Sequence, residues 1–335
     1  MRFSMGKHRA ALSRMGLGAA ASEKTSATDP RIHVSLSHLR GLAPAARAVS
    51  FLPRQPATSV LQGRHRSRIR GRGLDFEELR DYLPGDDVRA IDWKVTARAG
   101  KPYVRVYTEE RDRPTLIVVD QRMSMFFGSV RNTKAVTAAE CAAIAAHRVT
   151  AQGDRVGGIV FSDQDMVELR PGRGQAALTR MLTAVATANA RLSATAPTVT
   201  PMALNDVLKS VRKLAIRDHL VILISDFDAA DAADAATERH LGTIAQHNDL
   251  VLAVVRDPTS AQLPEAGTIT GTDGAKQAEL NMSDAQMRSD VLALSADRLA
   301  QVRTWQNRIG LSVLSLSTAE ETLPQVVQAL GGVRR

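Results

Sequence analysis

Short apolar runs alternate with longer amphipathic segments along residues 114–335. The run at 115–120 ends in Asp120 and a polar loop, and residues 219–228 repeat the pattern with Asp226 at the strand end. Apolar runs of this length, bounded by polar loops, are typical of strands buried in a parallel sheet. We predict strands at 115–120, 155–161, 219–225, 249–255 and 311–316, a hairpin from the second strand to about 169, and helices at about 132–151, 174–190, 201–215, 234–247, 284–309 and 319–330. This order predicts an α/β fold, a Rossmann-like and mostly parallel sheet with helices on both faces.

A different pattern precedes that domain. Phe76, Leu79 and Leu83 have helical spacing and predict a helix that Pro84-Gly85 ends, after which Ile91 and Trp93 anchor a second short element. Residues 103–107 alternate as a half-exposed strand. The charges in this region alternate in sign, which predicts ion pairs within the segment. Farther along, the irregular stretch 258–283 interrupts the strand–helix pattern and is expected to hold a hairpin.

Composition predicts a soluble, globular protein. The chain has 335 residues, of which 44% are hydrophobic and 24% are charged. No apolar run reaches the ~18 residues that a membrane-spanning helix needs. The single cysteine, Cys141, excludes a disulfide framework and any zinc site built from several cysteines. We therefore expect a reducing, cytoplasmic location.

The net charge of +9 is concentrated near the N-terminus. Residues 1–72 hold 14 Lys and Arg against 2 Asp and Glu (+12), whereas the remaining residues hold 30 against 33 (−3). Residues 1–58 are interpreted as a basic, largely disordered extension, 59–113 as a small module with β structure, and 114–335 as the main domain. The basic stretch 63–73 suits nucleic acid or an anionic surface, but it lacks the interleaved aromatic residues of single-strand binders. A solvated basic arm is the favoured interpretation.

Four oxygen-bearing side chains are expected to meet above the sheet. Asp120 and Asp226 follow strands, Ser124 lies in the loop after Asp120, and Thr200 precedes Pro201 in a helix-start arrangement. Carboxylates and hydroxyls suit Mg²⁺ or Mn²⁺. Spacing alone equally allows a purely structural role, in which Ser124 and Thr200 cap helices and the carboxylates accept backbone hydrogen bonds.

An ordered set of motifs between about Gly71 and Leu330 resembles the bacterial family called domain of unknown function 58. The motifs are Leu79-Arg80-Asp81-Tyr82, Gly85-Asp86-Asp87-Val88-Arg89, Ile91-Asp92-Trp93, Ala97-Arg98, Gly153-Asp154-Arg155-Val156-Gly157 and Ser225-Asp226-Phe227. Members of this family resemble von Willebrand factor A domains, so the resemblance implies a von Willebrand A-like fold for 114–335.

Such domains carry a metal-ion-dependent adhesion site, Asp-x-Ser-x-Ser with a distant Thr and Asp. The resemblance assigns these roles to Asp120, Ser124, Thr200 and Asp226, but Arg122 stands where the first Ser is expected. A guanidinium keeps its proton and competes with a divalent cation beside carboxylates. We expect Arg122 either to fold inward and replace the metal or to swing out and leave a weakened site. Asp228 is the further candidate binding residue.

The resemblance implies a non-enzymatic adaptor or partner of a MoxR-type AAA+ ATPase, which acts on a client protein that the sequence does not name. The chain has no ATP-binding Gly-x4-Gly-Lys-[Ser/Thr] loop of its own. A Mg²⁺-dependent phosphoryl-transfer hydrolase that uses Asp120 and Asp226 is the alternative. Against it, Arg122 stands where such enzymes place a second acid.

Overall fold

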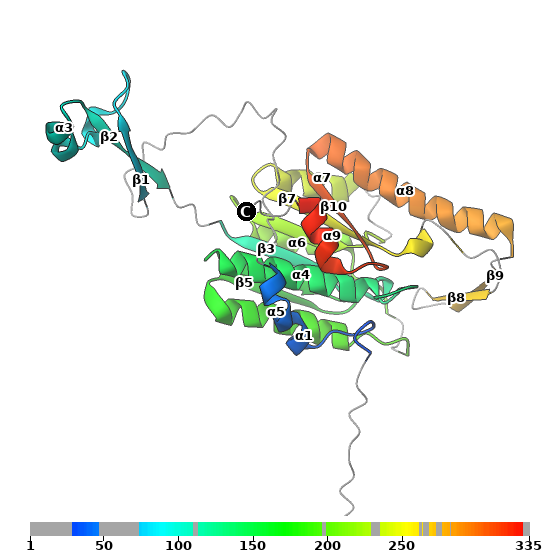
Figure 1. Cartoon of the computed structure of the whole chain (residues 1–335). Helices are drawn as coiled ribbons and strands as arrows, with labels where there is room; N and C mark the ends of the chain where they lie inside the picture. The colour runs from blue at the N-terminus through cyan, green and yellow to red at the C-terminus, as the bar shows by residue number, and fades with distance from the viewer. Residues whose placement is uncertain are drawn as a thin grey trace, which may run out of the picture.

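The computed structural model describes residues 29–46, 74–109, 113–195, 199–228, 235–260, 263, 268–272, 277–281 and 283–330. Its centre is a six-stranded sheet in the order β10-β7-β6-β3-β4-β5, in which β5 alone runs antiparallel to its neighbour (Figure 1). The strands are β3 (Thr115–Asp120), β4 (Val156–Phe161), β5 (Met166–Gly172), β6 (Leu220–Ser225), β7 (Asp249–Arg256) and β10 (Ser312–Ser317). The predicted α/β fold with a mostly parallel sheet is confirmed.

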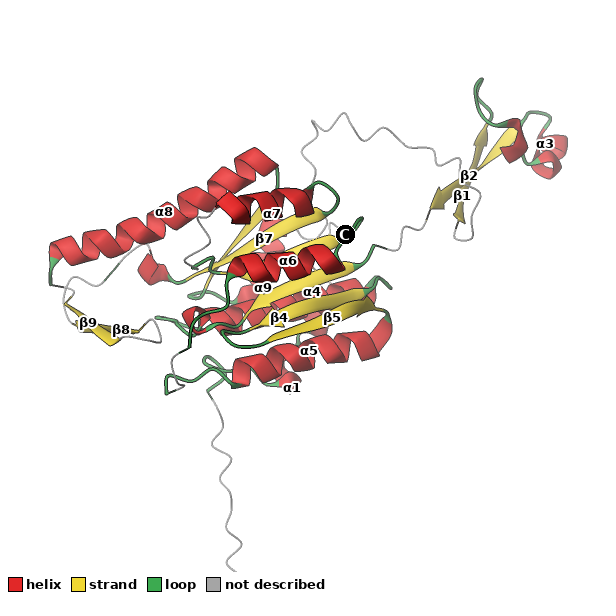
Figure 2. Cartoon of the chain, turned by 180° about the vertical axis from the view of Figure 1, so that it is seen from behind, coloured by secondary structure: helices red, strands yellow, loops and turns green. Residues whose placement is uncertain are grey.

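Helices cover both faces of this sheet, as the two opposite views show (Figures 1 and 2). One face packs against α4 (Lys134–Ala151), α5 (Gly174–Ala190) and α9 (Thr322–Leu330), and the other against α6 (Leu204–Leu214), α7 (Ala235–Ala245) and α8 (Ala285–Ile309). Strand β3 shows why the sheet has two cores. Ile117 and Val119 belong to the first core and Leu116 and Val118 to the second, because successive strand side chains point to opposite faces.

Two glycines in β4 allow close packing of neighbouring backbone. A Cβ on Gly158 would lie 2.3 Å from the carbonyl oxygen of Ile117, and one on Gly157 would lie 2.4 Å from that of Leu169. Neither position has room for a side chain. The strand therefore lies tightly between β3 and β5.

Residues 29–46 depart from the prediction of a largely disordered extension over 1–58. They contain α1 (Leu36–Gly41) and α2 (Ala43–Ala46), and Leu39 is fully buried in the core of the main domain. The carbonyl of Leu39 lies 2.9 Å from Nε2 of His147 on α4. A short helix between Arg31 and Arg47, interrupted by Gly41 and Pro44, is also compatible with the sequence, and α1 and α2 form there. The burial of this segment was not predicted, because its few apolar residues show no sustained period. The rest of 1–58, and the basic stretch 63–73, lie outside the described residues.

The predicted helix through Phe76, Leu79 and Leu83 is wrong. Residues Leu74–Asp81 form strand β1, which pairs antiparallel with β2 (Tyr103–Glu109). Three apolar residues at helical spacing are a weak signal, and the backbone hydrogen bonds to β2 decide the outcome. The connection holds η1 (Val88–Ala90) and α3 (Trp93–Ala99).

Ion pairs form within this small module, as the charge pattern predicts. They include Arg80–Asp86, Lys101–Asp81 and Arg105–Asp92. The hairpin expected in 258–283 is also present, as β8 (Thr268–Thr272) and β9 (Gln277–Asn281) after η3 (Pro258–Ser260). Among the residues described, no helix combines the length and the apolar character that crossing a membrane requires.

Candidate functional site

The carboxyl ends of β6, β3 and β4 lie side by side and bring polar residues together. Asp120, the last residue of β3, is fully buried. Its Oδ2 accepts a 2.6 Å hydrogen bond from Oγ of Ser225, the last residue of β6. Its Oδ1 accepts a 3.0 Å bond from the backbone N–H of Arg122. Burying a carboxylate costs free energy unless hydrogen bonds or an opposite charge compensate it. These two hydrogen bonds offset part of that cost for Asp120, and a positive charge is still needed.

The side chain of Arg122 supplies the compensating charge. Its Nη2 lies 2.6 Å from Oδ2 of Asp120, and its Nε lies 3.0 Å from Oδ1. The guanidinium folds inward and is only 2% exposed. It also donates to the carbonyl of Met202 at 3.1 Å and lies over the ring of Phe161, 5.3 Å from its centroid. Burial alone would lower the pKa of Arg122, but the charge and hydrogen bonds of Asp120 raise it above its usual range. The guanidinium therefore stays charged.

A second internal cation, Lys134, pairs with Asp226. Its Nζ lies 2.6 Å from Oδ2 of Asp226, and both side chains are largely buried. Lys134 is the first residue of α4, directly after Thr133, whose Oγ1 caps the helix by accepting from Val136 N–H at 3.2 Å. Burial works to raise the pKa of Asp226, yet Lys134 holds that pKa below its ordinary value. Asp226 is therefore a carboxylate at neutral pH.

Three further groups complete the edge of the site. The hydroxyl of Ser124 is 3.5 Å from Oδ1 of Asp226, a long contact. Asp228 pairs with Arg298 of α8, and its backbone N–H donates to Asp226 at 2.9 Å. Burial and the nearby Asp226 raise the pKa of Asp228. In the loop after β4, Asp163 accepts a 2.8 Å bond from Met123 N–H, and burial raises the pKa of Asp163.

As folded, this donor set does not fit a divalent cation. Both oxygens of Asp120 accept bonds from Arg122, and Oδ2 of Asp226 accepts one from Lys134. An ion there would have to displace two cations that carry the same sign of charge. In the parts of the chain that the structure describes, no group of three or more His, Cys, Asp or Glu side chains is arranged to hold a metal.

The structure brings Asp120, Arg122, Ser124 and Asp226 together, with Asp228 beside them. Thr200 differs from its predicted place: α6 begins at Leu204 with Ala203 as its N-cap, and Thr200 is an exposed loop residue. The expected helix start at Thr200-Pro201 is therefore wrong. The site also contains Lys134 and the Ser225 hydroxyl, neither of which was predicted from the sequence.

One signal pointed to Lys134. A lysine in the first turn of a helix is unfavourable beside the positive end of the helix dipole. A carboxylate partner such as Asp226 offsets that cost.

Comparison with known proteins identifies the family. A family model described as "Protein of unknown function DUF58" matches residues 78–301. The chain belongs to this family. The match includes most of the β1–β2 module as well as the strand ends that form the site.

Relatives of this DUF58 chain occur in mycobacteria. It is 30% identical over 295 residues to an uncharacterized protein of Mycobacterium tuberculosis (strain ATCC 25618 / H37Rv), across 88% of this chain and 90% of that protein. The same values hold for an uncharacterized protein of Mycobacterium bovis. A crystal structure described as an uncharacterized membrane spanning protein from Vibrio fischeri aligns with 58% of this chain and 97% of its own, at 14% identity and a TM-score of 0.23.

Proposed function

We propose that this DUF58 chain is a non-enzymatic protein-interaction module in which two internal cations take the place of a divalent metal. In this proposal the main domain is von Willebrand A-like, with a degenerate adhesion site at Asp120, and its partner is a MoxR-type AAA+ ATPase. The resemblance supports the ATPase partnership, and the single cysteine supports a cytoplasmic location.

The pairing of Arg122 with Asp120 carries the proposal. An adhesion-type metal neutralises the strand-end carboxylates and fixes the loop that follows. Arg122 does both here, because its guanidinium neutralises Asp120 while its backbone N–H and side chain tie the loop to Asp120 and to the carbonyl of Met202. Lys134 neutralises Asp226 in the same way. Partner binding at this edge is then independent of divalent ions.

The hydrolase alternative has less support. A nucleophilic Asp120 needs an accessible oxygen, yet this residue is fully buried and both of its oxygens accept hydrogen bonds. Nucleic-acid binding rests on the basic stretch 63–73, which lies outside the described residues. No observation on the described residues favours either alternative.

A binding assay with a purified ATPase tests the proposal. The chain is mixed with a nucleotide-free MoxR-type ATPase from the same organism, in millimolar Mg²⁺ or in EDTA, and the dissociation constant is measured. Leaving out nucleotide prevents the chelator from acting through ATP. We expect the same affinity in both conditions. We also expect weaker binding for Arg122→Ser and unchanged binding for Arg131→Ser, a matched change at an exposed arginine.

Two other outcomes of this binding assay would change the proposal. Binding that requires Mg²⁺ would overturn the metal-independent site and restore an adhesion-type mechanism. If the ATPase does not bind in either condition, the partnership is rejected, and the hydrolase and nucleic-acid alternatives gain weight.

A further inference from the structure

The β1–β2 module exposes an unusual group of apolar side chains. Eight large apolar side chains are exposed in the described part of the chain, and three of them, Leu83, Val88 and Trp93, lie within the connection between β1 and β2. Trp93 is 67% exposed although it opens a helix. Exposed tryptophan is uncommon on a surface that contacts only water, and tryptophan is enriched among the residues that dominate protein interfaces.

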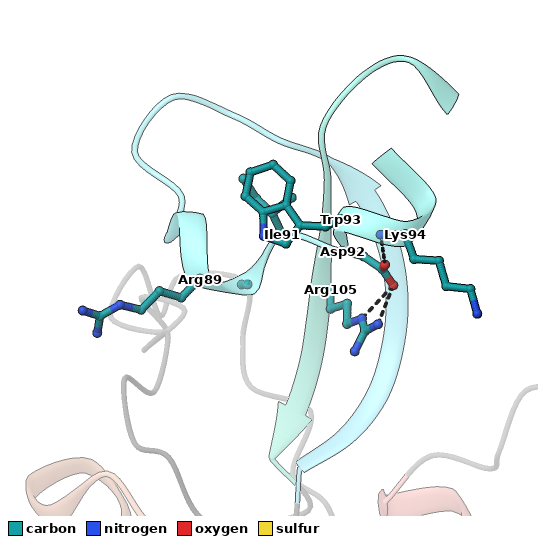
Figure 3. Close-up of a pocket in the computed structure, with 7 residues that line it drawn as sticks. Arg89, Ile91, Asp92, Trp93, Lys94 and Arg105 are labelled. Atoms are coloured by element: carbon teal, nitrogen blue, oxygen red, sulfur yellow. Dashed lines mark hydrogen bonds and ion pairs between the residues drawn. The ribbon is translucent and has the colours of Figure 1, made fainter. Parts of the chain in front are cut away.

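Trp93 borders a pocket of about 320 Å³. The other lining side chains include Arg89, Ile91, Asp92, Lys94 and Arg105. Figure 3 shows Trp93 beside Ile91, with Arg89 extending to one side and Lys94 to the other. This volume is at the small end of the ~300–1,000 Å³ that ligand pockets occupy, which suits one large side chain of a partner.

Some of the charged side chains around the pocket form an ion pair with each other, and others do not. Asp92 accepts bonds from Arg105 Nε at 2.8 Å and from the backbone N–H groups of Lys94 and Val95 at 3.0 and 3.1 Å. Arg105 holds the pKa of Asp92 below its usual value, so this pair is neutral overall. Among the residues described, Arg89 and Lys94 have no ion-pair partner. The uncompensated charge at the pocket is therefore positive.

We propose that this surface binds an acidic segment of a partner protein, with an apolar side chain of that segment against Trp93 and carboxylates beside Arg89 and Lys94. The inference concerns residues 83–105, which are separate from the Asp120 site. It goes beyond the proposed function and stands whether or not the metal-free site is correct.

A peptide is favoured over a nucleic acid for two reasons. Residues 74–109 hold 6 Lys and Arg against 8 Asp and Glu, a net charge of 6 − 8 = −2, so the described part of this module carries no excess of positive charge for a long polyanion to follow beyond the pocket. Single-strand binders also use several aromatic side chains for base stacking. Here one exposed tryptophan lies in a segment whose other large exposed apolar side chains, Leu83 and Val88, are aliphatic.

Tryptophan fluorescence reports directly on this surface. The chain has 2 tryptophans, and Trp305 is fully buried, so acrylamide quenching of the full-length protein measures the exposure of Trp93. The probes are a blocked Asp/Glu peptide with a central Phe-Leu, the same peptide with Lys for each acid, the acidic peptide with Ser-Ser at its centre, and oligothymidine. The proteins are the wild type, Arg89→Glu/Lys94→Glu and the control Lys213→Glu/Arg217→Glu, which reverses two exposed cations elsewhere.

We expect only the acidic Phe-Leu peptide to protect Trp93 from quenching, with protection that falls as salt is added. The Arg89→Glu/Lys94→Glu protein should bind this peptide at least ~10-fold more weakly, a loss of about 1.4 kcal/mol. The control should bind as the wild type does, and circular dichroism should show both variants folded. Equal protection by the acidic and lysine peptides, no protection by any peptide, or unchanged binding in the charge-reversed variant would each overturn the proposal. Protection by oligothymidine alone would replace it with nucleic-acid binding.

Discussion

The guanidinium of Arg122 and the carboxylate of Asp120 form a two-point ion pair, with Nη2 2.6 Å from Oδ2 and Nε 3.0 Å from Oδ1. Both side chains are almost completely buried. The pair fixes the loop after β3 against the carbonyl of Met202 in the loop before α6. A metal ion at the strand end would otherwise provide such contacts.

Breaking the Arg122–Asp120 pair from one side should be costly. We expect Arg122→Met to lower the free energy of unfolding by about 3–5 kcal/mol, because Asp120 is left as a buried charge without its partner. Asp120→Asn in the same chain should recover a large part of that loss. Urea unfolding of the two single variants and the double variant measures the coupling energy. Additive effects would show that the two side chains do not act as a pair.

The Lys134–Asp226 pair should make stability depend on pH in a defined direction. The folded-state pKa of Asp226 lies below its usual value of 3.8, so the pair's contribution is present above about pH 4 and is lost as the pH falls through the folded pKa. We expect Lys134→Met to cost about 3 kcal/mol at pH 7. In the Lys134→Met variant, burial without the lysine raises the pKa of Asp226, so this carboxyl takes up a proton as the pH falls. The difference in the free energy of unfolding between the variant and the wild type should therefore shrink from pH 7 to pH 4. A difference that is constant across this range would show that Lys134 acts through packing alone.

Asn189 on α5 connects the N-terminal segment 29–46 to the site. Its Oδ1 accepts from the backbone N–H of Val34 at 2.8 Å, and its Nδ2 donates to Oε1 of the fully buried Gln121 at 2.9 Å. Asn189→Ala leaves both groups unpaired, and we expect a loss of about 2–4 kcal/mol. Hydrogen exchange should accelerate at the Val34 amide. Gln175→Ala, an exposed amide on the same helix, is the control, and equal exchange in the two variants would refute the connection.

The main sheet was predictable from sequence because its strands are buried on both faces. Runs such as Thr115–Asp120 stay apolar at successive positions, and helix-length crossovers leave few alternatives to a parallel sheet. Strand β1 was not predictable in this way. The spacing of Phe76 and Leu79 fits a helix, and the pairing that decides for a strand comes from β2, more than 20 residues later. The pattern of apolar residues within 74–83 therefore carries no information on the pairing of β1 with β2.

The site was predictable only in part, for a related reason. Asp120, Arg122 and Asp226 follow strands whose carboxyl ends share one edge of the sheet, so topology alone brings them together. Lys134 reaches the site from the start of α4, and its partner Asp226 lies 92 residues away. Thr200 was placed by its position before Pro201, a local rule, but the helix begins at Leu204 instead.

Direct titration with Mn²⁺ tests whether internal cations occupy the place of a divalent metal. Electron paramagnetic resonance counts bound ions for the wild type, for Asp226→Asn alone, for Arg122→Ser/Lys134→Ala, and for this double variant with Asp226→Asn added. We expect no bound Mn²⁺ in the wild type at millimolar concentration, one bound ion in the double variant, and none in the double variant once Asp226 is changed. One Mn²⁺ bound to the wild type, and lost with Asp226→Asn alone, would contradict this expectation.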